Sequence, residues 1–82
     1  MPTSSINRDD DRGVIWARRR VELGRKLRAA RLARGLTQEA LALASSVSRN
    51  MVIEIESGRR GVLAERIPDL TEALGIEPGA LL

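Results

Sequence analysis

Cysteine and histidine are both missing from this sequence of 82 residues. Without cysteine the chain can form no disulfide and no thiolate metal site, and without histidine it lacks the commonest nitrogen ligand for metals. Catalytic relays built on a cysteine or a histidine are excluded as well. We therefore expect a protein that is not an enzyme and that needs neither a metal ion nor another cofactor.

Long apolar runs are absent too. No stretch approaches the roughly 20 apolar residues that a membrane-spanning helix needs. The first residues, MPTSSINRDDDRG, are polar and acidic, whereas a secretory leader has a basic start followed by an apolar core. We therefore expect a cytoplasmic protein that does not contact a membrane. Its length leaves room for one domain with a small core.

Negative charge is scarce in the first part of the chain. Residues 1–34 contain ten Arg or Lys residues and four acids, whereas residues 35–82 contain four and seven, and the net charge of the chain is only +3. The basic residues concentrate in RRRVELGRKLRAARLAR, and nearly all are arginine, whose planar guanidinium donates two hydrogen bonds to a phosphate at once. A solvated helix face has the same composition, so this run alone does not identify a partner.

The residues that are present predict helices and no strand. The polar and acidic residues 1–13 are typical of a mobile leader. No proline interrupts residues 14–34, and apolar residues such as Leu23 and Leu27 recur there at helical spacing. This pattern predicts a first helix that Gly35 ends. The sequence leaves its start open, because Asp9–Asp11 favour an early helix N-terminus, whereas Gly13 and Gly24 weaken a helix.

Two short helices are predicted next, with almost nothing between them. Thr37 is a suitable N-cap for a helix over residues 38–45, and Ser48 is one for a helix over residues 49–57, which Gly58 ends. The gap permits only a tight turn, so the two helices can bury their apolar faces against each other at a steep angle.

The remainder of the chain predicts a fourth helix in AERIPDLTEALG and a short terminal turn in EPGALL. The residues expected to face inward are Ala40, Leu41 and Ala44 in the second helix, Val52 and Ile55 in the third, and Ile67, Leu70 and Leu74 in the fourth. The predicted fold is a compact all-α bundle of five helices over residues 14–82, behind a disordered leader over residues 1–13.

The stretch LTQEALALASSVSRNMVIEIESGRR, residues 36–60, resembles the helix-turn-helix of the phage repressor and Cro-like family, also called the xenobiotic-response-element family. In that family the pattern L-[TS]-Q-x-x-L-A…V-S-x-x-x-[IV]-x-x-[IL]-E-x-G-x-R recurs. The resemblance extends from Leu23 to the end of the chain and includes LGRKLRAARLARG and LTEALGIEPGALL. It implies a lambda-repressor-like fold and a sequence-specific DNA-binding transcription regulator of the Cro/C1 type.

The resemblance also implies a role for each residue that matches the pattern. The positions of the recognition helix that read bases in the major groove correspond to Ser48, Arg49, Asn50, Ile53 and Glu54. The positions that hold the phosphate backbone correspond to Gln38, Ser57, Arg59 and Arg60. Arg31 and Glu56 correspond to an internal ion pair that ties the first helix to the recognition helix, and we expect both side chains to be largely buried.

Two of these positions have a second interpretation. Glu54 can accept a hydrogen bond from cytosine, or it can pair with Arg49 or Arg60 and orient that arginine. Ile53 stands at a position that is commonly polar, so it can contact a thymine methyl group or belong to a protein interface. The sequence leaves both alternatives open.

The chain departs from the family pattern at the turn between the two short helices. Ser46 stands where glycine is frequent, and a left-handed conformation there would cost a serine on the order of 1 kcal/mol. Ser45 stands where an apolar residue is usual, so we expect Leu43 or Val47 to move inward in its place.

The expected function is transcription regulation by a repressor or autoregulator that binds double-stranded DNA as a homodimer. We expect the dimer contact in the C-terminal segment, Ile76–Leu82, because Leu81 and Leu82 have no following segment to cover them. Trp16, the only aromatic residue, is the competing anchor for this contact.

Several biological settings fit this pattern: a phage-type repressor, a restriction-modification controller, or an antitoxin that represses its own operon and has a toxin or another protein as partner. The alternative from a different class is a non-catalytic protein-interaction module, in which Arg49 and Asn50 are ordinary solvated residues. The acidic second half of the chain and Ile53 favour that alternative.

Overall fold

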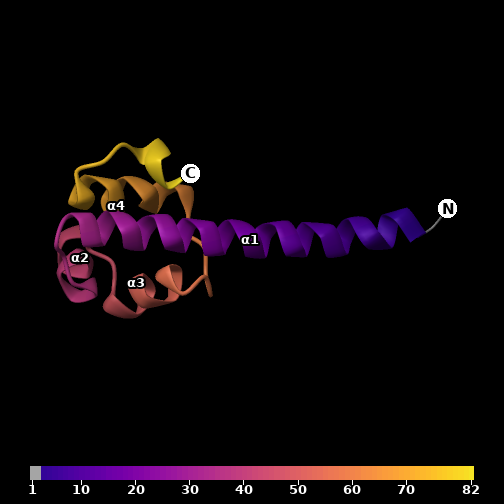
Figure 1. The fold of residues 1–82 in the computed structure, drawn as a ribbon, viewed down its shortest axis with the longest axis horizontal. Helices are drawn as coiled ribbons and strands as arrows, with labels where there is room; N and C mark the ends of the chain where they lie inside the picture. The colour runs from indigo at the N-terminus through magenta and orange to yellow at the C-terminus, as the bar shows by residue number, and fades with distance from the viewer. Residues whose placement is uncertain (1–2) are drawn as a thin grey trace.

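The structure, a computed structural model, describes the backbone of residues 3–82 and the side chains of residues 12–82. It contains the α-helices α1 (Thr3–Ala33), α2 (Gln38–Ser45), α3 (Arg49–Glu56) and α4 (Ile67–Leu74), and the 3₁₀ turns η1 (Ala64–Arg66) and η2 (Pro78–Leu81) (Figure 1). No strand occurs in the described backbone. The predicted all-α fold is confirmed.

The number of helices differs from the prediction of five. The last expected element is the 3₁₀ turn η2, which has four residues. Pro78 can begin a helical turn because its φ is preset and its missing N–H is not needed there. A segment this short closes i→i+3 hydrogen bonds more readily than the i→i+4 bonds of an α-helix, so the bundle has four α-helices.

The helix α1 begins at Thr3, earlier than the predicted start at about Val14. Gly13 lies inside it, and a glycine costs a helix only about 1 kcal/mol relative to alanine, too little to interrupt a segment without proline. The boundary predicted at residue 13 is therefore not a break in the backbone. Met1 and Pro2 lie outside the described residues, and the mobility of the leader stays a prediction.

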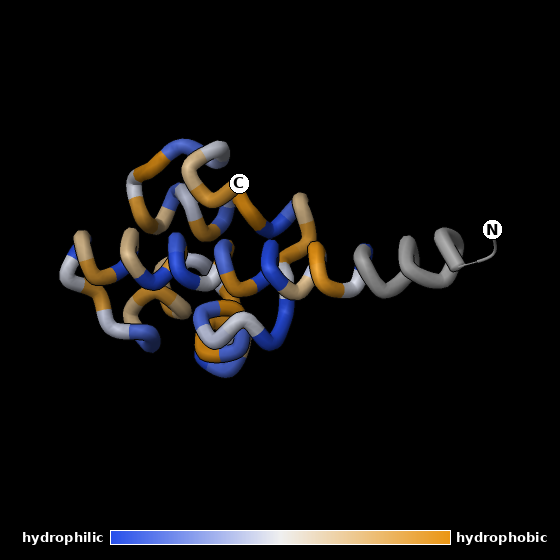
Figure 2. The backbone as a smooth tube through the Cα atoms, turned by 45° about the vertical axis from the view of Figure 1, so that its right-hand side comes forward, coloured by the Kyte–Doolittle hydropathy of each residue, from blue (hydrophilic) through white to orange (hydrophobic). Residues whose placement is uncertain are grey.

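Only the C-terminal half of α1 packs against the other helices. Figure 1 shows its N-terminal part projecting past α2, α3 and α4, and the molecule measures 51 Å along its longest axis against 22 and 20 Å along the others. In Figure 2 the coloured turns of α1 carry both hydrophobic and hydrophilic residues, as expected for a helix that buries one face. No helix in the described chain is both long enough and apolar enough to cross a membrane.

The two short helices begin where the sequence predicted. Thr37 Oγ1 accepts a hydrogen bond from the Ala40 N–H at 3.0 Å, and Ser48 Oγ accepts one from the Met51 N–H at 3.0 Å. In the turn between α2 and α3, Ser46 has a φ of 60°, so the left-handed conformation expected there is present in a residue other than glycine. Local signals thus set the limits of the helix-turn-helix unit.

The core forms where the four α-helices meet, and the inward residues predicted for α3 and α4 are all buried. In α2 the buried residues are Leu41, Ala42 and Ser45, whereas Ala44 is exposed, so the predicted inward stripe was wrong on one side. Both flanks of this short helix carry alanine, so the hydrophobic pattern alone did not distinguish them.

The substitute for the apolar residue missing at Ser45 is Val47. Val47 is 7% exposed, whereas Leu43 is 80% exposed. The Ser45 hydroxyl is buried and donates to the Leu41 carbonyl oxygen at 2.7 Å, which satisfies its polar atom inside the core. A serine is therefore accommodated here without an unpaired hydroxyl.

The helices α1 and α3 approach each other closely at Gly24. A Cβ atom at this position would meet the carbonyl oxygens of Ile55 and Glu56, the latter at 2.8 Å. These are backbone atoms of α3, so they cannot move aside as the end of a flexible side chain would. The close crossing of α1 over α3 therefore requires glycine at position 24.

The C-terminal residues fold back over α1 and α4 (Figure 1). Leu81 is only 2% exposed and belongs to the core, so the expectation that it lacks a cover was wrong. Leu82 remains largely exposed, and its carbonyl oxygen accepts a hydrogen bond from Lys26 Nζ at 2.8 Å. This bond ties the end of the chain to α1.

Candidate nucleic-acid interface

The first turn of α3 presents polar side chains outward. Arg49 and Asn50 are exposed, and within the described chain neither side chain forms a hydrogen bond. On the opposite side of the same helix, Val52 and Ile55 are fully buried. The core therefore fixes the orientation of α3 and leaves its first turn free to contact another molecule.

Ser48 precedes this turn and has a second role as its N-cap. Its Oγ accepts the Met51 N–H at 3.0 Å, so the oxygen is engaged with the helix. The hydroxyl hydrogen is not needed for this cap and can still be donated to an acceptor outside the protein. Ser48 thus caps α3 and keeps its hydroxyl hydrogen available.

Glu54 adopts one of its two predicted arrangements. Its Oε1 lies 3.2 Å from Arg60 Nη1, and both side chains are nearly half exposed. The carboxylate therefore orients Arg60 rather than Arg49. Ile53, beside it, is partly buried.

The residues after α3 form a short basic loop. Ser57 Oγ donates to the Glu54 carbonyl oxygen at 3.0 Å, and Gly58 turns the chain with a φ of 77°. Arg59 and Arg60 follow and are both exposed. The turn thus places two arginines directly beyond the C-terminal end of α3.

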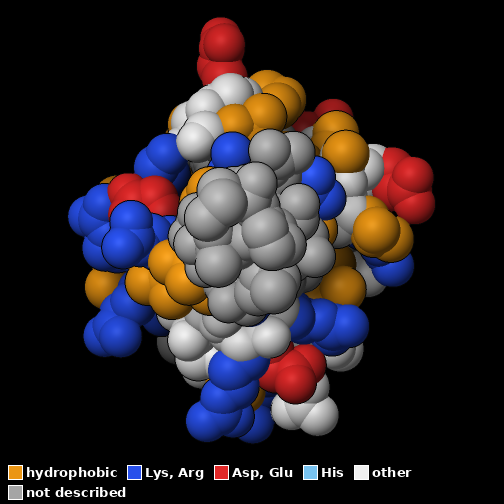
Figure 3. Space-filling model, turned by 90° about the vertical axis from the view of Figure 1, so that its right-hand side faces the viewer, with side chains coloured by type: hydrophobic (Ala, Val, Ile, Leu, Met, Phe, Trp, Pro, Cys, Tyr) orange, Lys and Arg blue, Asp and Glu red, His pale blue; other side chains and the backbone are white. Residues whose placement is uncertain are grey.

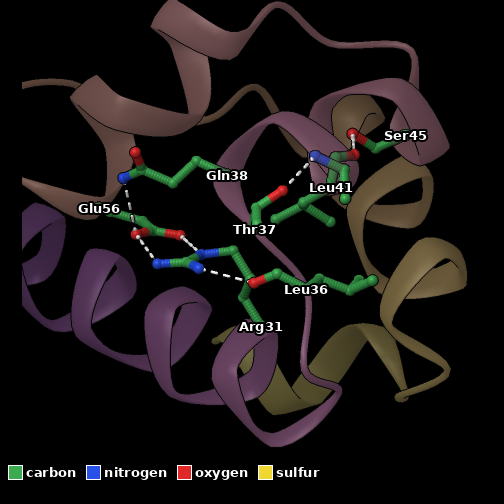
Figure 4. Close-up of polar contacts among 8 residues, drawn as sticks. Arg31, Leu36, Thr37, Gln38, Leu41, Ser45 and Glu56 are labelled. Carbon is green, nitrogen blue, oxygen red and sulfur yellow. Dashed lines mark hydrogen bonds and ion pairs between the residues drawn. The ribbon is translucent and has the colours of Figure 1, made fainter.

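A buried ion pair joins α1 to the end of α3 (Figure 4). Arg31 Nε donates to Glu56 Oε2 at 2.6 Å and Arg31 Nη2 donates to Glu56 Oε1 at 3.0 Å, and the side chains are only 9% and 5% exposed. Arg31 Nη1 also donates to the Leu36 carbonyl oxygen at 2.7 Å. The hydrogen bond with Glu56 raises the pKa of Arg31, against the opposing effect of burial, so the guanidinium stays charged. The ion pair expected from the sequence is present.

Gln38 belongs to the same network, which the sequence did not reveal. Its Nε2 donates to Glu56 Oε1 at 3.2 Å, so this side chain links the start of α2 to the end of α3 (Figure 4). The backbone N–H groups in the first turn of α2 lack partners within the helix, as at any helix N-terminus. Gln38 thus stands at a place where an anion is favoured, although its side chain is already engaged.

Nowhere in the described part of the chain do three acidic side chains gather in a way that could hold a metal ion. The candidate site therefore consists of the exposed first turn of α3, the basic loop after it and the N-terminus of α2.

The model of the helix-turn-helix family matches residues 27–81. The chain belongs to the helix-turn-helix family. Its function is DNA-binding transcription regulation, as the sequence pattern predicted, and its partner is double-stranded DNA. Most of the projecting part of α1 precedes the matched range.

Similar helix-turn-helix proteins are named as controllers and regulators. The control protein C.BamHI of Bacillus amyloliquefaciens is 36% identical over 64 residues, which cover 77% of this chain and 79% of that protein. The restriction-modification controller protein C.AhdI of Aeromonas hydrophila is 43% identical, with a TM-score of 0.74 over 77% of this chain and 96% of that one. The clp gene regulator ClgR of C. glutamicum is 36% identical, with a TM-score of 0.72 over 77% and 82%. These proteins are regulators rather than enzymes.

Proposed function

We propose that this helix-turn-helix protein recognises a specific operator with the first turn of α3. The observation that carries the proposal is the contrast between the two faces of that helix. Val52 and Ile55 are held in the core, while Arg49 and Asn50 project freely from the surface. A helix fixed from behind can hold its exposed side chains at a constant distance from base edges.

The chemistry of these side chains suits the major groove. The Arg49 fork matches N7 and O6 of guanine, and the Asn50 amide matches N6 and N7 of adenine. Ser48 contributes a hydroxyl hydrogen. Glu54 acts through its ion pair with Arg60, and Ile53 is the residue available for a thymine methyl group.

Phosphate contacts on both sides of α3 would fix its depth in the groove. Arg59 and Arg60 provide them after α3, joined by Ser57 when its hydroxyl leaves the Glu54 carbonyl oxygen, and the N-terminus of α2 at Gln38 provides them before it. The Arg31–Glu56–Gln38 network supports this arrangement, because it fixes the distance between the start of α2 and the end of α3.

The similar proteins favour one biological setting. C.BamHI is a control protein and C.AhdI is a restriction-modification controller, and the second is 43% identical over nearly its whole length. We infer that this chain is likewise a controller or autoregulator of a restriction-modification system. The operator that it selects should then occur upstream of genes in its own operon.

We also infer that the regulator binds as a homodimer through its C-terminal segment, Ile76–Leu82. Leu81 is not available because it is in the core, so Leu82, which is 80% exposed, and Ile76 would carry the apolar contact. Two-fold symmetry would place two α3 helices one DNA turn apart, roughly 34–36 Å. Sedimentation at rising concentration should show a dimer, and a strict monomer at high micromolar concentration, with and without DNA, would contradict it.

Selection of duplexes from a random pool, followed by single substitutions, tests the proposal. Arg49→Ala or Asn50→Ala should cost about 1–3 kcal/mol on the selected site and relax the preference at one or two base pairs. Arg59→Ala should weaken all duplexes alike and lower the slope of log affinity against log salt by about one unit. Arg66→Ala is the matched control, because Arg66 lies in η1, outside the residues assigned to DNA contact, and pairs with Asp69 of α4.

Two results would contradict the proposal. If no motif is enriched, the chain is a protein-interaction module rather than a sequence-specific regulator. If Arg49→Ala and Arg59→Ala cause the same uniform loss with no change of preference, α3 does not read bases even though the protein binds DNA.

A further inference from the structure

The middle of α1 carries an excess of positive charge. Residues 12–26 contain six Arg or Lys residues and one acid, Glu22, whose carboxylate is bound by Arg25. Figure 3 views the molecule from the N-terminal end of α1 and shows Lys and Arg side chains on several sides of it, with hydrophobic side chains between them. This segment precedes the range matched by the family model. Its charge is therefore a feature of this chain beyond the helix-turn-helix itself.

Arg20 is the most unusual of these residues. Its Nε is buried, yet it has no hydrogen-bond partner among the described residues. A buried donor without an acceptor costs stability, so such an atom in a folded protein calls for an explanation. One explanation is that the side chain turns outward and that Nε then donates to an acceptor on a bound molecule.

The surroundings of Arg20 place it beside the basic loop that follows α3. Its Cγ lies 3.8 Å from the position that a Cβ of Gly61 would occupy, and Val21 contacts Gly58 at the start of the same loop. Gly61 comes directly after Arg60. The α1 arginines and the loop arginines thus lie on neighbouring elements.

A hollow separates α1 from this loop. It is lined by Trp16, Arg19, Arg20, Leu23, Gly61 and Val62. The two arginines in its lining suit a phosphate, and the apolar side chains suit the deoxyribose that follows each phosphate along a DNA strand. The lining therefore offers both basic and apolar side chains to a sugar-phosphate backbone.

We propose that Arg19 and Arg20 bind a backbone phosphate of the operator duplex, next to the phosphates held by Arg59 and Arg60. The proposal rests on the DNA binding by α3 described above and extends its footprint to α1. Arg19 is exposed and can reach a phosphate directly, whereas Arg20 must turn its guanidinium outward before a phosphate oxygen can supply the acceptor that its Nε lacks. The contact is independent of sequence, because phosphates repeat along every duplex.

The salt dependence of binding tests this contact. On a random duplex and on the selected site, Arg20→Ala and Arg19→Ala should each lower the slope of log affinity against log salt by about one unit, since about 0.9 counterion is released per neutralised phosphate. Base preference on the selected site should not change. Arg20→Lys should restore the slope, because it keeps the charge. Arg66→Ala removes an equal charge from η1 and should leave the slope unchanged.

Thermal unfolding of each variant separates loss of contact from loss of fold. If Arg20→Ala unfolds the protein, the test of the proposal uses Arg19→Ala and Arg20→Lys instead. Arg19 is exposed, so its removal should not unfold the protein, and the lysine variant keeps the charge at position 20. The proposal is overturned if Arg59→Ala lowers the slope and the folded Arg19 and Arg20 variants do not; the role of α3 would then stand. It is also overturned if these variants dissociate the protein in the absence of DNA with no change in slope, which would make the hollow a protein contact.

Discussion

Replacing Glu56 by glutamine should destabilise the protein strongly although the two side chains have nearly the same shape. The substitution removes the charge that compensates Arg31, whose side chain is only 9% exposed. Breaking a buried ion pair from one side costs about 3–5 kcal/mol. Arg31 keeps its hydrogen bond to the Leu36 carbonyl oxygen at 2.7 Å, so we expect a loss near the lower limit, about 3 kcal/mol.

Removal of the other partner should cost more. Arg31→Met leaves the Glu56 carboxylate buried with Gln38 as its remaining partner, and it also deprives the Leu36 carbonyl oxygen of its donor. The double variant Arg31→Met, Glu56→Leu removes both charges and should recover much of the lost stability, because an apolar pair of similar volume leaves no uncompensated charge.

Urea unfolding followed by circular dichroism, at one fixed protein concentration, measures these differences. A domain of this size has a total stability of about 4–12 kcal/mol, so a loss of about 3 kcal/mol shifts the midpoint by roughly 1–3 M. Glu54→Gln is the control, because it breaks the pair with Arg60, in which both side chains are nearly half exposed, and should cost less than about 1 kcal/mol. A Glu56→Gln loss no larger than that of the control would refute the reasoning.

Two further substitutions test the backbone. Gly24→Ala should lower the stability by about 1–3 kcal/mol despite the better helix propensity of alanine, because its Cβ would meet backbone oxygens of α3. Gly13→Ala, which has nothing within 4 Å of the added Cβ, should cause no loss of stability in the same urea unfolding experiment. Equal effects of the two would show that α1 and α3 are not closely packed. Ser46→Gly should raise the stability by up to about 1 kcal/mol by relieving the left-handed conformation, and Ser46→Val should lower it. A stabilised valine variant would show that the turn does not require this conformation.

The sequence by itself determined the limits of the helix-turn-helix and the family. Thr37 and Ser48 cap their helices by accepting hydrogen bonds from backbone N–H groups only three residues further along the chain, so these bonds depend little on the rest of the molecule. The left-handed turn at Ser46 and the positions that match the family pattern are equally local. The pairing of Arg31 with Glu56 was available only through the resemblance, because 25 residues separate the two.

Tertiary packing decided what short-range patterns leave undetermined. Helical spacing shows that α2 has an apolar face, but the choice of Val47 over Leu43 as the buried side chain depends on how α2 sits on its neighbours. Leu81 is buried because η2 folds back over the core, a contact between segments distant in sequence. From the sequence, Gly24 is only a residue that lowers the helix propensity of α1. The structure shows why glycine stands there, because α3 passes too close to α1 at this position for any side chain.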